Sequence, residues 1–70
     1  MGVKTTNRER DLLLLIREGL PNREIAARLG IGEQTVKNAL AVLYQKFHVR
    51  NRTQLALVAV LAGSSVNRPE

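Results

Sequence analysis

Residues 33–47 carry two opposed sets of side chains at the spacing of an α-helix, and no other pattern restricts the fold as strongly. The first set is apolar and consists of Val36, Ala39, Leu40, Leu43 and Phe47. The opposite set is polar or small and consists of Gln34, Lys37, Asn38, Ala41 and Gln45. A helix with this pattern buries its first face in a core and leaves the second face on the surface.

The surface face of this stretch offers amide and ammonium groups but no carboxylate. Such groups match the hydrogen-bonding edges of base pairs in the DNA major groove. An ordinary amphipathic helix with a solvated polar side would show the same pattern. The stretch by itself therefore leaves both interpretations open.

A first helix is expected over residues 7–18. Thr6 and Glu9 have the spacing of a capping box, in which each side chain binds a backbone amide at the helix start. Gly19 suits the left-handed conformation that ends many helices. The expected buried residues are Leu12, Leu13 and Ile16, with Leu15 beside them. Leu14 is expected on the more solvent-exposed side of the helix.

A second helix is expected over residues 22–29, because Pro21 fits a first helical turn and Gly30 fits a helix end. Ile31 and Gly32 then form a very short turn before the helix over residues 33–47. A short helix, a tight turn and a longer helix make a helix-turn-helix.

A fourth helix is expected over residues 52–62, started by Asn51 and Gln54 at capping spacing. It is apolar on every side, although so small a domain can cover only one side of it. Leu55, Val58, Ala59 and Ala62 can face the core, which leaves an outer face of Thr53, Ala56, Leu57, Val60 and Leu61. A second copy of the chain is the favoured cover, and a flanking domain is the alternative.

These elements predict an all-α, compact four-helix domain that contains a helix-turn-helix. The expected organisation is an extension over residues 1–5, the domain over residues 6–63 and a flexible tail over residues 64–70. A chain of 70 residues makes one small domain, and the lack of cysteine excludes a disulfide framework or a thiolate zinc site. A single histidine does not build a metal site, so no metal or other cofactor is expected.

The charge of the chain favours a polyanionic partner. Eleven Lys and Arg stand against six Asp and Glu, a net charge of +5, and residues 34–69 contain no acid. Charge alone does not separate DNA from RNA or anionic lipid. The apolar runs are too short to span a membrane and no secretory signal is visible, so no membrane partner and a cytoplasmic location are expected.

The order of these motifs resembles the LuxR/GerE-type helix-turn-helix, the output domain of many bacterial response regulators and quorum-sensing activators. The resemblance rests on residues 6–9 (TNRE), 19–26 (GLPNREIA), 29–37 (LGIGEQTVK) and 46–54 (KFHVRNRTQ). It implies that the helix over 33–47 enters the major groove and that the helix over 52–62 dimerises. RNA polymerase is a further candidate partner of such a regulator.

The chain departs from the family pattern at several positions. Pro21 and Gly32 stand where serines commonly cap the second and third helices, Thr5 replaces a leucine, and Ala39 replaces a histidine. His48 stands where glycine is common, at a position that favours a left-handed backbone. None of these changes removes the polar face of residues 33–47.

Together, the pattern and the resemblance assign three groups of site residues. The expected DNA base contacts are Gln34, Lys37, Asn38, Ala41 and Gln45, with Asn38 suited to adenine and Ala41 to the thymine methyl group. The expected DNA phosphate contacts are Asn22, Arg23, Thr35, Lys46, Arg50 and Arg52, although Thr35 equally suits a local capping bond. The expected dimer interface is Thr53, Ala56, Leu57, Val60 and Leu61.

The favoured function is sequence-specific binding of double-stranded DNA in a bacterial transcription regulator, and two alternatives remain. Region 4 of a sigma factor shares the helix-turn-helix, but it would act as a monomer with RNA polymerase, which the apolar fourth helix argues against. A protein-interaction module is the second alternative. An enzyme is not expected, because the chain lacks paired carboxylates, a nucleophile with a base, and a phosphate-binding loop.

Overall fold

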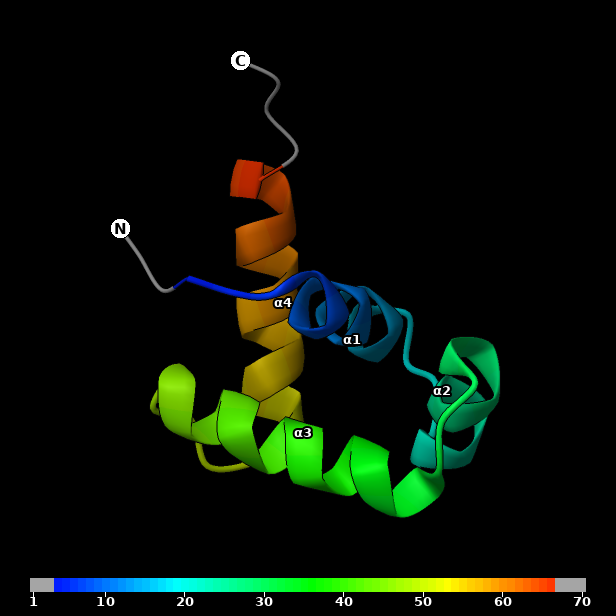
Figure 1. The fold of residues 1–70 in the computed structure, drawn as a ribbon. Coiled ribbons are helices and arrows are strands. Elements are labelled where there is room, and N and C mark those ends of the chain that lie inside the picture. Colours follow the sequence, from blue (N-terminus) through cyan, green and yellow to red (C-terminus); the bar gives the residue numbers. More distant parts are fainter. Residues whose placement is uncertain (1–3, 67–70) are drawn as a thin grey trace.

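The computed structural model describes the backbone of residues 4–66 and the side chains of residues 4–61. The chain forms α1 (Asn7–Arg17), α2 (Asn22–Leu29), α3 (Glu33–Lys46) and α4 (Arg52–Val66), and the described residues contain no strand. This arrangement confirms the prediction of an all-α domain with four helices. Figure 1 shows α3 running across one end of the domain, α4 running away from it, and α1 and α2 beside them.

The capping box expected at the start of α1 is present. The hydroxyl oxygen of Thr6 accepts a hydrogen bond from the amide of Glu9 at 3.1 Å, and Oε1 of Glu9 accepts one from the amide of Thr6 at 3.0 Å. Asn51 caps α4 in a similar way, because its Oδ1 accepts from the amide of Gln54 at 2.9 Å. These bonds satisfy amides that have no partner inside the helices.

The first three helices end in the same way, at a residue with a positive φ. These residues are Gly19 (φ 82°), Gly30 (φ 69°) and His48 (φ 56°). After each of them, the next amide reaches five residues back to a helix carbonyl, from Leu20 to Leu15, from Ile31 to Ala26, and from Val49 to Tyr44. This pattern is a Schellman motif. The left-handed backbone expected at His48 is therefore confirmed, although histidine is less suited to it than glycine.

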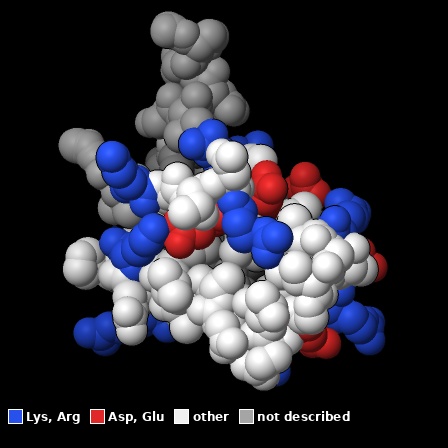
Figure 2. Space-filling view, viewed as in Figure 1, with Lys and Arg blue, Asp and Glu red and all other residues white. Residues whose placement is uncertain are grey.

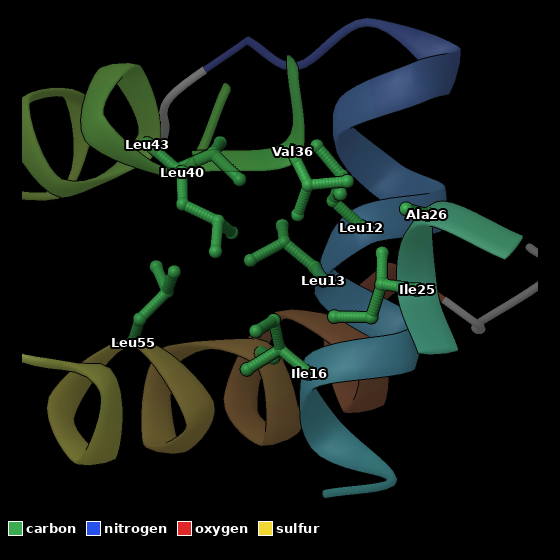
Figure 3. Close-up of a cluster of buried hydrophobic side chains, with 10 residues drawn as sticks. Leu12, Leu13, Ile16, Ile25, Ala26, Val36, Leu40, Leu43 and Leu55 are labelled. Atoms are coloured by element: carbon green, nitrogen blue, oxygen red, sulfur yellow. The ribbon is translucent and has the colours of Figure 1, made fainter. Parts of the chain in front are cut away.

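One hydrophobic core joins all four helices, and α1 packs against each of the other three. Figure 3 shows side chains from the four helices converging between them. Every core residue named in the sequence-based prediction of α1 is buried, whereas Leu14 is 40% exposed as expected. The core consists of Leu12, Leu13, Ile16, Ile25, Ala26, Val36, Leu40, Leu43, Leu55 and Ala59.

The structure corrects several expected helix ends. The fourth helix runs to Val66 and not to Ala62, because Gly63 inside a helix costs only about 1 kcal/mol and does not have to end it. Residues 64–66 of the expected tail are thus helical, and residues 67–70 lie outside the described part. Glu18 and Phe47 are caps and not helical residues, and Pro21 precedes the first turn of α2 as its cap. Within the described residues, no helix is long and apolar enough to cross a membrane.

Candidate nucleic-acid interface

The polar face of α3 lies on the surface along the whole helix. The side of α3 that carries Val36, Leu40 and Leu43 is buried, with at most 3% of any of these residues exposed. Burying this side turns the opposite one to solvent, since residues three and four apart share a helix face. All five expected base-contact residues are exposed: Gln34, Lys37, Asn38, Ala41 and Gln45.

The charge distribution leaves this face open to a nucleic acid. Figure 2 shows an uncharged stretch of surface over α3 with charged groups at its margins, and the polar face of α3 itself carries one cation, Lys37. Glu33, the first residue of α3, is the only acid in that helix. No carboxylate on the rest of α3 therefore opposes the approach of a phosphate backbone.

Two residues of this face are bound to each other. Nε2 of Gln34 donates a hydrogen bond to Oδ1 of Asn38 at 3.0 Å, across one helical turn. Both side chains are exposed. The side-chain amides at the start of this face are thus arranged relative to each other before any ligand is present.

The start of α3 has backbone amides without a side-chain cap. Gly32 is the capping residue and provides no side-chain hydrogen bond. Thr35 is exposed, and among the described residues its hydroxyl makes no hydrogen bond, so the local capping bond considered for it does not form. Free amides at a helix start favour an anion such as a phosphate.

Two of the expected phosphate contacts are bound together inside the domain. The Arg52 guanidinium donates to Oδ1 of Asn22 at 2.7 Å and to the carbonyl oxygen of Leu20. Arg52 begins α4, whereas Leu20 and Asn22 lie at the join of α1 and α2. The guanidinium therefore fastens the start of α4 to the start of α2.

Lys46 is also held inside the domain. Its Nζ lies 2.7 Å from Oε1 of Glu9 and donates to the carbonyl oxygen of Lys4 at 3.2 Å. The hydrogen bond from Lys46, helped by the amide of Thr6, lowers the pKa of Glu9 below its ordinary value of 4.5. This ion pair connects the end of α3 with the start of α1.

The partners of Arg52 and Lys46 were missing from the sequence-based assignment. Each pair joins residues at least 30 positions apart, and no local spacing indicates such a contact. The remaining expected cations, Arg23 and Arg50, are exposed, and among the described residues neither side chain forms an ion pair. No group of His, Cys, Asp or Glu in this part of the chain is arranged to hold a metal ion.

The outer side of α4 is an exposed apolar surface. Leu57 is 60% exposed, Leu61 63% and Val60 44%, and Thr53 is exposed beside them. Ala56 differs from the expectation, since it is half-buried and packs against the core. We call Thr53, Leu57, Val60 and Leu61 the outer face of α4.

Comparison with known proteins places this arrangement in a family. Residues 4–59 match the bacterial regulatory proteins of the luxR family, which is a family of regulators and not of enzymes. The transcriptional regulatory protein YhcZ of Bacillus subtilis, itself uncharacterized, is 51% identical over 55 residues, which are 79% of this chain and 26% of that protein.

Two further relatives have names that state their roles. The DNA-binding transcriptional activator DevR/DosR of Mycobacterium tuberculosis is 46% identical over 54 residues, 77% of this chain and 25% of that protein. The nitrate/nitrite response regulator protein NarL of Escherichia coli is 46% identical over 52 residues, 74% of this chain and 24% of that protein. The chain spans about a quarter of the length of these relatives. Because the family match covers most of the chain, the protein belongs to the luxR family of bacterial regulatory proteins.

Proposed function

We propose that this domain binds double-stranded DNA sequence-specifically, as the output domain of a bacterial transcription regulator, with α3 in the major groove. The observation that carries the proposal is the exposed face of α3, which is free of acids from Gln34 onward, while Val36, Leu40 and Leu43 on the opposite face are buried. A helix of 14 residues is about 21 Å long and fits a groove roughly 12 Å wide. Such a role belongs in the cytoplasm, where bacterial DNA lies.

The middle of the face supplies the base contacts in this proposal. Lys37 suits the acceptor atoms of guanine, Asn38 the paired acceptor and donor of adenine, and Ala41 the methyl group of thymine. Gln34 and Gln45 lie at the two ends of the face. Their exposure, together with the absence of a competing carboxylate, supports this assignment.

The phosphate contacts surround the base contacts. Thr35 and the free amides at the start of α3 suit one phosphate, and the exposed cations Arg23 and Arg50 suit others. The proposed set of phosphate contacts still includes Asn22, Lys46 and Arg52. These residues have fewer hydrogen-bonding groups free for a phosphate, because they already have internal partners. An ammonium has three donors, so Lys46 keeps one for a phosphate beyond the two it uses.

A second copy of the chain is the proposed cover for the outer face of α4. Three large apolar side chains exposed side by side favour association, because burying them removes apolar surface from water. Ala56 borders this interface in the proposal, although it also packs against the core of its own chain. Two-fold pairing would present two copies of α3 to half-sites roughly 10 base pairs apart. RNA polymerase remains a proposed partner of the assembled regulator.

Selection from random duplex DNA tests the central proposal. The domain is incubated with the duplexes at two salt concentrations, and the retained duplexes are sequenced. We expect an enriched two-fold-symmetric site and an affinity that falls steeply as salt rises. Replacing Lys37 by Ala should weaken binding by about 1–3 kcal/mol and relax the preference at one base pair. Salt-independent binding, or no binding, would instead indicate a protein-interaction module.

Sedimentation tests the proposed dimer separately. Leu57→Asp places a carboxylate in the middle of the outer face of α4, which should shift the domain to the mass of a single chain. Leu14→Asp is the matched control, because it changes an exposed leucine on α1. Circular dichroism checks that both variants fold. Equal masses for Leu57→Asp and the parent would contradict the α4 interface.

A further inference from the structure

We propose that Gln34 positions the side-chain amide of Asn38, so that the two residues together recognise a single A·T base pair. This inference rests on the proposed function, since it requires α3 to lie in the major groove. It changes the role of Gln34, which becomes a positioning residue for Asn38 and not a reader of its own base.

The geometry of the pair carries this inference. Gln34 and Asn38 are four residues apart, and their side chains meet at 3.0 Å on the exposed face of α3. Neither side chain has another hydrogen-bond partner among the described residues. One bond thus favours a particular orientation of the Asn38 amide plane, whereas an isolated asparagine on a helix surface turns freely about its last torsion.

The remaining donors and acceptors of Asn38 fit adenine. A side-chain amide oxygen has two lone pairs, and Gln34 occupies one of them. The second lone pair and the Asn38 NH₂ group remain available. Adenine presents a matching pair in the major groove, because its N6 amino group donates and its N7 atom accepts.

Holding the amide in advance strengthens selectivity. A side chain already oriented for its partner loses less freedom on binding. Rotation of the Asn38 amide by half a turn, which would exchange its oxygen and nitrogen, breaks this bond unless the Gln34 amide rotates as well. Gln34 therefore sharpens the preference for adenine without touching the base.

The experiment compares Gln34→Met, Asn38→Ala, the double variant and the parent domain. Methionine keeps the length and helix preference of glutamine but lacks the amide. Each protein selects its site from random duplexes, and its affinity is then measured for the parent's site carrying adenine or 7-deazaadenine at the position read by Asn38. The analogue lacks the N7 acceptor. Gln45→Met is the matched control at the far end of the same face.

We expect Asn38→Ala to lose at least about fivefold selectivity for adenine, which is the value of a weak bidentate base contact. Gln34→Met should lose about twofold selectivity at the same base pair, which is the value of a Gln–Asn bond across one helical turn, and it should respond less to 7-deazaadenine. Gln34→Met should have no further effect on this base preference once Asn38 is alanine, because Asn38→Ala already removes the hydrogen bond between the two side chains. Gln45→Met should leave that base pair unaffected.

Two other results would overturn the inference and distinguish it from the proposed function. If Gln34→Met relaxes a different base pair from Asn38→Ala, Gln34 reads its own base. If Gln34→Met changes thermal stability but no base preference, the bond only stabilises the helix. Failure of the parent domain to enrich any site would count against the proposed function itself.

Discussion

The variant Arg52→Met tests whether Arg52 stabilises the fold or contacts a DNA phosphate. In the structure its guanidinium binds Asn22 and the carbonyl oxygen of Leu20, and so joins the start of α4 to the start of α2. Methionine has a similar helix preference and covers similar apolar surface. The variant therefore removes these two hydrogen bonds and one charge.

The expected loss of stability follows from these contacts. A partly exposed hydrogen bond to a charged group contributes roughly 1 kcal/mol, so the two bonds contribute about 2 kcal/mol. Arg52 also places a positive charge at the positive end of the α4 dipole, which is unfavourable. Removing this charge therefore raises the free energy of unfolding by about 0.5 kcal/mol. The net loss is about 1.5 kcal/mol, which lowers the melting temperature of a domain this small by roughly 6–12 °C.

Thermal unfolding followed by circular dichroism measures this loss, at one protein concentration for all variants because dimerisation would shift the transition. Arg50→Met is the matched control: it removes a neighbouring exposed cation whose side chain forms no ion pair in the described part of the chain. We expect Arg50→Met to leave the melting temperature within about 4 °C of the parent, since surface substitutions rarely exceed 0.5 kcal/mol.

DNA binding completes the comparison. A residue that neutralises one phosphate contributes about one to the slope of log affinity against log salt. We expect Arg50→Met to reduce the slope by this amount and Arg52→Met to reduce it by less, because the Arg52 guanidinium already binds Asn22 and Leu20. The reverse pattern, an unaltered melting temperature and a reduced slope for Arg52→Met, would refute the structural role derived from its hydrogen bonds.

Two other predictions concern the caps. His48→Gly should raise the free energy of unfolding by about 0.5–1 kcal/mol, because it relieves a left-handed backbone (φ 56°) at the end of α3, and a lower stability in urea titration would contradict this explanation. Glu9→Gln should lower stability at neutral pH by about 0.5–1 kcal/mol, because it removes the ion pair with Lys46 but keeps a side chain that suits the capping box. Since the folded protein lowers the pKa of Glu9, its contribution is present above the ordinary value of 4.5 and is lost as the pH falls through the lowered pKa. The difference between parent and variant should therefore shrink on acidification, and a constant difference across that range would argue against the ion pair.

The local features of this fold could be predicted from the sequence because their causes are local. The capping box at Thr6 and the left-handed ends at Gly19 and Gly30 depend on residues a few positions apart. The two faces of α3 follow from helical spacing alone. The end of α4 could not be predicted in this way, because Gly63 only weakens a helix and does not decide where it stops.

The internal partners of the cations could not be predicted in this way, since they lie far away in the sequence. Lys46 and Arg50 look alike in the sequence, both being basic residues near the end of α3. Only the packing of α1 against α3 brings Glu9 to Lys46, and only the packing of α1 against α4 brings Leu20 to Arg52. Composition therefore indicates a polyanionic partner but does not show which cations remain available to it.

The same long-range contacts bear on how a dimer would reach its DNA. The join between α3 and α4 is short, and hydrogen bonds at His48 and Asn51 fix the backbone at both of its ends. Arg52 then fastens the start of α4 to the helix-turn-helix. Under the proposed function, α3 and the outer face of α4 are thus parts of one rigid body. The separation of the two half-sites would then be set by this join rather than by flexible linkage, and inserting glycines between His48 and Asn51 should broaden the tolerated spacing without changing the sequence of each half-site.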